Sequence, residues 1–267
     1  VAVFSVVGVI PYIAIQLKAI TTSIKIVLNE TGNNNYVEFT SWIVLLFITI
    51  FIVLFGTRKI DFREKHEGLV TAIAFESIIK LVSFLIVGAG VVYLYMGGWS
   101  HLMHLSQSLP SFSKMTTFQN DANTYQYGLL MLLSLFAFLF LPRQFQVGVV
   151  ENASDAHLKK AIWIFPLYLF LINLFVLPIA FSGKIILGSS TNADTFILDI
   201  PKYFHSNVLL LIAYIGGFSA ATSMIVVETI AISIMISNNI VAPVFLSSSN
   251  FKDQFDIGLN KWVKNIR

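Results

Sequence analysis

Charged side chains are rare inside the apolar stretches of this sequence, and three of them could do chemistry there: Glu76, Lys80 and Glu228. A charge inside a bilayer is costly, and such residues commonly mark ion or solute pathways and proton relays. Glu76 and Lys80 are four positions apart with the acid first, which favours an ion pair on one helix face. A structural pair is the simpler interpretation, and a transport or relay role is the alternative. Glu228 has no such partner in the sequence and is the more suggestive acid.

Small and hydroxyl-bearing residues precede Glu228 in the same stretch, where a pair of glycines is followed by Ser219, Thr222 and Ser223. Small residues let helices approach closely in membranes, so close packing is the default explanation. Hydroxyl oxygens beside a carboxylate also suit a hard cation such as sodium. Thr222 and Ser223 are therefore candidate ion-binding residues, and Ser219 is a candidate solute-binding residue.

Two prolines interrupt other apolar stretches. Pro11 bends the first stretch, and Tyr12 and Gln16 follow it on one helix face, where they could line a cavity or bond to another helix. Pro142 follows an unbroken apolar run. A break at membrane depth is tolerated only where protein or a water-filled cavity satisfies the freed backbone, so Pro142 is a candidate site residue. The alternative is that the span ends at Leu141 and a new cytoplasmic helix begins.

Six apolar stretches must position these residues. Each approaches the roughly 20 residues that a helix needs to cross a bilayer, and the second is the shortest. They cover residues 1–27, 41–55, 70–96, 127–147, 162–181 and 208–236. We therefore expect an all-α polytopic membrane protein in which residues 1–267 form one transmembrane domain.

Composition excludes several functional classes. Hydrophobic residues make up 56% of the chain and charged residues 12%, too few charges to cover a water-exposed surface. The basic residues stand beside spans, as membrane topology requires, so nucleic acid is not an expected partner. No set of convergent catalytic groups and no metal-ligand spacing is evident, so we expect neither an enzyme nor a metal site in this chain.

The basic residues also predict an orientation. Most Lys and Arg residues lie in residues 56–69, 143–161 and 247–267. Because positive residues accumulate in cytoplasmic loops, these three segments are predicted to be cytoplasmic in a multi-pass protein of the cell inner (plasma) membrane. The segments on the opposite side are rich in Asn, Ser, Thr and Gly, which favour turns and irregular chain.

Several segments, in order along nearly the whole chain, resemble the sodium/solute symporter family. They are residues 11–20 (PYIAIQLKAI), 56–61 (GTRKID), 141–145 (LPRQF) and 216–240 (GGFSAATSMIVVETIAISIMISNNI). Residues 66–81 (HEGLVTAIAFESIIKL) and 141–152 (LPRQFQVGVVEN) are most similar to the symporter-like domains fused to bacterial sensor histidine kinases.

The resemblance implies a LeuT-type inverted repeat with substrate and sodium near the bilayer centre. The six stretches resemble core helices three to eight of that fold. The first core helix, which supplies much of the family's substrate and sodium sites, would then precede Val1. The chain resembles a piece of a longer protein, and we expect that it does not transport alone.

The resemblance also implies roles for individual residues. Tyr12 matches a tyrosine of the substrate pathway, and Pro142 matches the proline of the sixth core helix. Where proline transporters carry a tryptophan and a tyrosine before that proline, this chain has Ser134 and Phe138. Phe138 is thus a candidate solute-binding residue, and the solute need not be proline.

The family's sodium site uses adjacent hydroxyl residues on the eighth core helix. An alignment without gaps back from residues 238–239 places Ser223 and Met224 there. A thioether is a poor sodium ligand, and Thr222 could replace it only if the helix rotated or shifted. Sodium is therefore a possible, not a required, cofactor, and sensing or altered coupling is favoured.

The predicted function is a symporter-like membrane domain that binds, and in the full-length protein could transport, a small polar solute such as an amino acid. The resemblance implies that it is the input module of a sensor histidine kinase, with kinase domains downstream. A stand-alone sodium-coupled symporter is the alternative. A membrane enzyme or a purely structural bundle is the third hypothesis.

Overall fold

The computed structural model is built from helices throughout the residues that it describes, which are 2–28, 34–55, 67–110, 112–116, 121–152, 154–188 and 191–241. No strand occurs in these ranges. This confirms the predicted all-α class. Of the predicted cytoplasmic segments, most of 56–69 and all of 247–267 lie outside the described residues.

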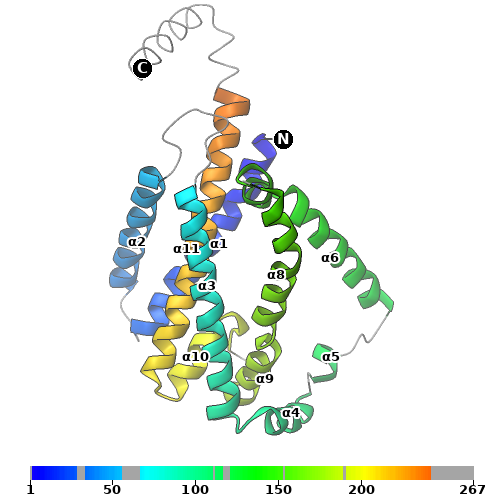
Figure 1. Ribbon diagram of the computed structural model, residues 1–267. Coiled ribbons are helices and arrows are strands. Elements are labelled where there is room, and N and C mark those ends of the chain that lie inside the picture. Colours follow the sequence, from blue (N-terminus) through cyan, green and yellow to red (C-terminus); the bar gives the residue numbers. More distant parts are fainter. Residues whose placement is uncertain are drawn as a thin grey trace, which may run out of the picture.

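The long helices follow the apolar stretches, and shorter helices connect them (Figure 1). The α-helices are α1 (Ala2–Leu28), α2 (Asn34–Phe55), α3 (Glu67–Ala89), α4 (Trp99–Gln107), α5 (Phe112–Thr116), α6 (Asp121–Phe140), α7 (Pro142–Phe145), α8 (Asp155–Asn173), α9 (Val176–Ile186), α10 (Phe196–Tyr203) and α11 (Asn207–Ile236). Single π-helical turns extend α3, α7 and α11 at η1 (Gly90–Tyr95), η2 (Gln146–Val150) and η4 (Ser237–Val241), and a 3₁₀ turn, η3 (Ala193–Thr195), precedes α10.

Four helical segments of the described chain are long and apolar enough to cross a membrane: Ala2–Leu28, Val70–Tyr95, Asp155–Ile186 and Asn207–Val241. A fifth is obtained if α6 and the α7–η2 segment, which meet at a bend of 46°, count as one broken span. Helix α2 occupies the second predicted stretch but is not among these candidates. The structure therefore supports four or five of the six predicted spans.

The bend at Pro142 has a local cause. Leu141 is extended (φ −65°, ψ 133°) and ends α6, and Pro142 begins α7 at a position where its missing N–H costs no helical hydrogen bond. The predicted break in this stretch is thus present.

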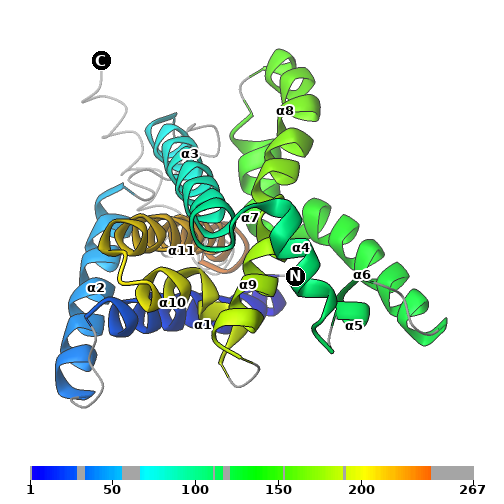
Figure 2. The same ribbon diagram turned by 90° about the horizontal axis from the view of Figure 1, so that it is seen from below.

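Helix α11 is the central helix of the bundle, with α3 on one side and α1 on the other (Figure 1, Figure 2). The α1–α11 contact buries apolar side chains of both helices, namely Ile20, Ile24, Ala221 and Ile225. A second apolar core, nearer the end that carries α10, includes Val87, Val91, Phe181, Phe196 and Ile200. These contacts fix which faces of α1 and α3 point toward α11.

The close approach of α3 to α11 depends on Gly216. A Cβ atom added there would lie 2.6 Å from the Cβ of Ser83, closer than real Cβ contacts come. The predicted role of the small residues in close packing is therefore supported at this position.

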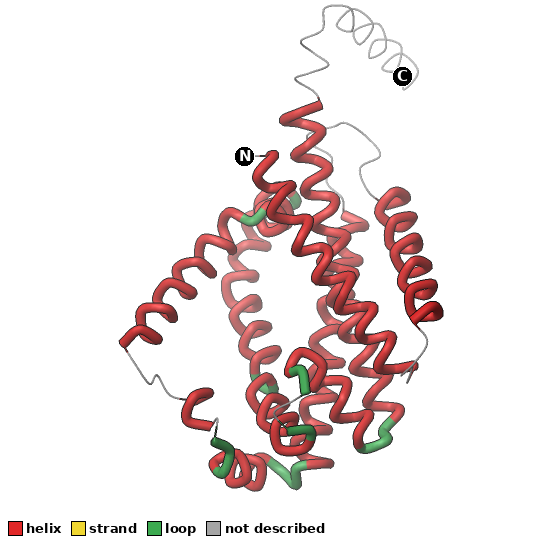
Figure 3. Tube along the Cα trace, turned by 180° about the vertical axis from the view of Figure 1, so that it is seen from behind, coloured by secondary structure: helices red, strands yellow, loops and turns green. Residues whose placement is uncertain are grey.

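The outer faces of the bundle are apolar, as lipid contact requires. Phe4 of α1 is 84% exposed and Trp163 of α8 is 81% exposed. Helices α2 and α6 lie at opposite edges of the bundle, as Figure 3 shows from behind.

The two ends of the bundle carry different elements. Helix α7, the end of α2 and the start of α3 lie at one end, and α10 lies at the other (Figure 1).

Candidate functional site

The most distinctive polar contact in the bundle joins α1, α7 and α11. Arg143 Nη1 donates a hydrogen bond of 2.8 Å to the Tyr12 hydroxyl oxygen, and the Arg143 Cζ atom lies 5.6 Å from the centroid of the Tyr12 ring. The Tyr12 hydroxyl in turn donates to Met224 Sδ at 3.0 Å. Three segments far apart in sequence therefore meet at one polar position.

Local structure explains why these side chains meet. Tyr12 lies on the ridge of α1 that continues, in steps of four residues, to Ile20 and Ile24, which pack on α11. Arg143 is in the first turn after the break at Pro142, and α7 contacts α11 directly. The break thus turns Arg143 into the bundle.

One acidic residue, Glu228, and a second basic residue, Lys80, lie within electrostatic range of Arg143, and Glu76 lies within range of Lys80. Glu228 on α11 is only 2% exposed, and its carboxylate interacts electrostatically with the Arg143 guanidinium. Glu76 and Lys80 on α3 interact with each other, and Lys80 also experiences the charge of Arg143. We call Glu76, Lys80, Arg143 and Glu228 the charged cluster; it carries two charges of each sign when all four residues are ionised.

The sequence identifies three members of the charged cluster and misses the fourth. It assigns Arg143 to a cytoplasmic segment, because this residue follows a predicted span. The signal that could have found it is its position one residue after a proline that breaks an apolar run. In the structure Arg143 lies in helix α7, is half-buried and donates a hydrogen bond to Tyr12.

The hydroxyl residues of α11 mainly bind backbone or carboxylate oxygens. Ser219 Oγ donates to the Glu76 carbonyl at 3.1 Å, and the Ser223 hydroxyl donates toward the Glu76 carboxylate. Thr222 Oγ1 donates within its own helix, to the carbonyls of Phe218 (2.9 Å) and Ser219 (3.2 Å). The two serine bonds link α11 to α3, and an ion-binding role for Thr222 and Ser223 remains a prediction.

The other predicted solute-binding residues are less closely associated with this position. Gln16 is half-buried on α1, one turn after Tyr12, and Pro142 is half-buried beside Arg143. Ser134 is exposed on α6 and donates to the Leu130 carbonyl at 2.7 Å. The side chain of Phe138 lies outside the described residues.

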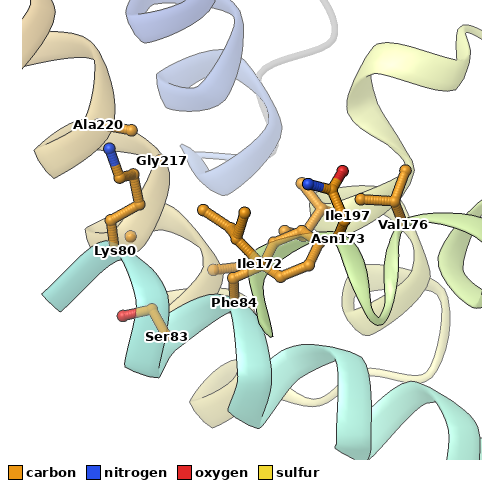
Figure 4. Close-up of a pocket in the computed structure, with 11 residues that line it drawn as sticks. Lys80, Ser83, Phe84, Ile172, Asn173, Val176, Ile197, Gly217 and Ala220 are labelled. Carbon is orange, nitrogen blue, oxygen red and sulfur yellow. The ribbon is translucent and has the colours of Figure 1, made fainter. Parts of the chain in front are cut away.

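Lys80 also lines a cavity of about 350 Å³, which lies between α3, α11 and the junction of α8 and α9 (Figure 4). Its wall is mostly apolar, and its polar side chains are Lys80, Ser83 and Asn173. Asn173 Nδ2 donates to the Leu169 carbonyl at 2.7 Å. None of the predicted solute-binding residues lines this cavity, so it is separate from the Tyr12–Arg143 contact.

The fold and the site define a class but not a family. The described chain is all-helical, with four or five helices long and apolar enough to span a membrane and a charged cluster between them. Comparison with family models, curated proteins and solved structures gives no match to this chain.

Proposed function

We propose that this chain is part of a solute-binding membrane domain of the sodium/solute symporter kind, with a LeuT-type arrangement of its core helices. The solute is small and polar, in the class of amino acids. The domain serves as the input module of a sensor histidine kinase in the inner membrane, and a stand-alone sodium-coupled symporter is the alternative.

The contact between Tyr12 and Arg143 is the observation that carries this proposal. The family resemblance selects Tyr12 and Pro142, which are far apart in the sequence, and the residue directly after Pro142 contacts Tyr12. Lys80 and Glu228, which are of opposite sign, lie within electrostatic range of Arg143. An amino acid carries one group of each sign, and a guanidinium and a carboxylate at one position are complementary to such a solute.

The surroundings of Met224 favour the sensor over the sodium-coupled alternative. Its thioether accepts a hydrogen bond from the Tyr12 hydroxyl, and by the family resemblance Met224 matches a position where the family has a hydroxyl ligand. Sodium prefers oxygen ligands, which a thioether does not supply. Solute binding in this chain is therefore expected to depend little on sodium.

Thermal stabilisation of the purified full-length protein tests the proposal. A panel of amino acids is added with and without sodium, because a ligand that binds only the folded state raises the melting temperature. Arg143→Gln should abolish the stabilisation, and Lys25→Gln, which changes an exposed basic residue near the end of α1, should leave it intact. Stabilisation that survives Arg143→Gln, or none with any solute, would contradict the proposed site.

Autophosphorylation distinguishes the two forms of the proposal. A sensor kinase should incorporate phosphate from ATP at a rate that changes with the stabilising solute. A full-length protein that has no such activity and accumulates solute only in a sodium gradient would be the stand-alone symporter instead.

A further inference from the structure

Glu228 is the least solvated charged residue in the described part of the chain. It is 2% exposed, and its Oε2 atom is buried with no hydrogen-bond partner. An unpartnered carboxylate oxygen buried in a membrane bundle is energetically costly, whereas a carboxylic acid has no net charge. The position therefore calls for a bound proton or a cation.

Among the helices around Glu228, α7 provides a positively charged side chain that interacts with it. This side chain is Arg143. Helix α3 brings Glu76 and Lys80 into the charged cluster, and α1 brings Tyr12. The described side chains of α2 carry no charge, and Glu151 after η2 accepts a hydrogen bond of 3.1 Å from Gln146.

Arg143 has two partners that compete for its guanidinium. In this structure it donates to the uncharged Tyr12 hydroxyl, and Glu228 Oε2 is left without a partner. A guanidinium bonds more strongly to a carboxylate than to a neutral hydroxyl. The observed arrangement is therefore the one that a protonated Glu228 would favour.

We propose that Glu228 is a proton-binding site and that Arg143 moves between Tyr12 and Glu228 as this proton leaves and returns. When the acid O–H bond breaks, the proton passes to water. The carboxylate that remains attracts Arg143 away from Tyr12. When the proton returns, the carboxylate charge is lost and Arg143 goes back to Tyr12.

A metal cation fits this position less well than a proton. Sodium and similar hard ions need several oxygen ligands at once. Around Glu228 the structure offers one free carboxylate oxygen, with the thioether of Met224 one turn away and the positive charge of Arg143 nearby. A proton needs only the free oxygen and no cavity.

Infrared spectroscopy of the full-length protein in lipid nanodiscs tests this proposal without any solute, so its result is independent of the proposed function. The C=O stretch of a protonated carboxyl is separate from the bands of a carboxylate. We expect such a band in the wild type to disappear as the pH is raised. It should be missing in Glu228→Gln and unchanged in Asp194→Asn, which alters an exposed acid.

Tyr12→Phe provides a second test if Glu228→Gln does not fold. Removing the hydroxyl frees Arg143 for the carboxylate, so the midpoint of the band should move to lower pH than in the wild type. A band that persists in Glu228→Gln, a midpoint unchanged in Tyr12→Phe, or no titrating band in the wild type would each overturn the proposal.

Discussion

Arg143 donates a 2.8 Å hydrogen bond to Tyr12 across 131 positions of sequence, and this contact connects the helix break at Pro142 to the first helix of the chain. The guanidinium also lies over the Tyr12 ring. One side chain thereby joins α7 to α1 through both a hydrogen bond and a cation–π contact.

The Arg143–Tyr12 contact should contribute measurably to stability. A hydrogen bond to a charged group is typically worth about 1.5 to 3 kcal/mol, so Tyr12→Phe and Arg143→Gln should each lower the melting temperature of the full-length protein. Because both changes remove the same interaction, the double variant should lose much less than the sum of the two single losses. Losses that add fully would show that the two residues do not interact.

Gly216 should be intolerant of a side chain, because an added Cβ would lie 2.6 Å from the Cβ of Ser83. Overpacking of this kind costs about 1 to 3 kcal/mol, so Gly216→Ala should lower the melting temperature by several degrees. Gly217→Ala is the matched control, since nothing lies within 4 Å of an added Cβ there.

A compensating variant sharpens this test. Ser83→Gly removes the atoms that the new methyl group would meet, and it should restore much of the stability that Gly216→Ala loses. If Gly216→Ala and Gly217→Ala behave alike, the close approach of α3 and α11 at Gly216 is wrong.

The helices are predicted well from the sequence because their signal is local. Apolar runs and the proline at position 142 determine the all-α class and the position of the break. The partners of the polar residues depend on tertiary contacts, which one sequence does not contain. Glu76 and Lys80 are recognisable as a pair because they share one helix, whereas the approach of Arg143 to Tyr12 and Glu228 depends on the direction in which α7 leaves the break.

Met224 should control the dependence of solute binding on sodium. Met224→Ser replaces a soft thioether with a hydroxyl oxygen next to Ser223, the ligand type that sodium prefers. In the full-length protein, sodium should then increase solute-induced stabilisation more than it does in the wild type. Met235→Ser, which changes another half-buried methionine of α11, should have no such effect. An unchanged sodium dependence in Met224→Ser would contradict the assignment of this position to the sodium site.

The predicted orientation can be tested by labelling, because the chain contains no cysteine and each introduced cysteine is therefore unique within it. Lys159 and Ala193 are both exposed, near the start of α8 and before α10 respectively, and these elements lie at opposite ends of the bundle (Figure 1). The concentration of basic residues predicts that the Lys159 end lies in the cytoplasm. A membrane-impermeant maleimide should therefore label Ala193→Cys in intact spheroplasts and Lys159→Cys only in inverted vesicles. The reverse pattern would overturn the orientation and leave the helical packing unchanged, whereas labelling of both positions from one side would show that the helices between them do not cross the membrane an odd number of times.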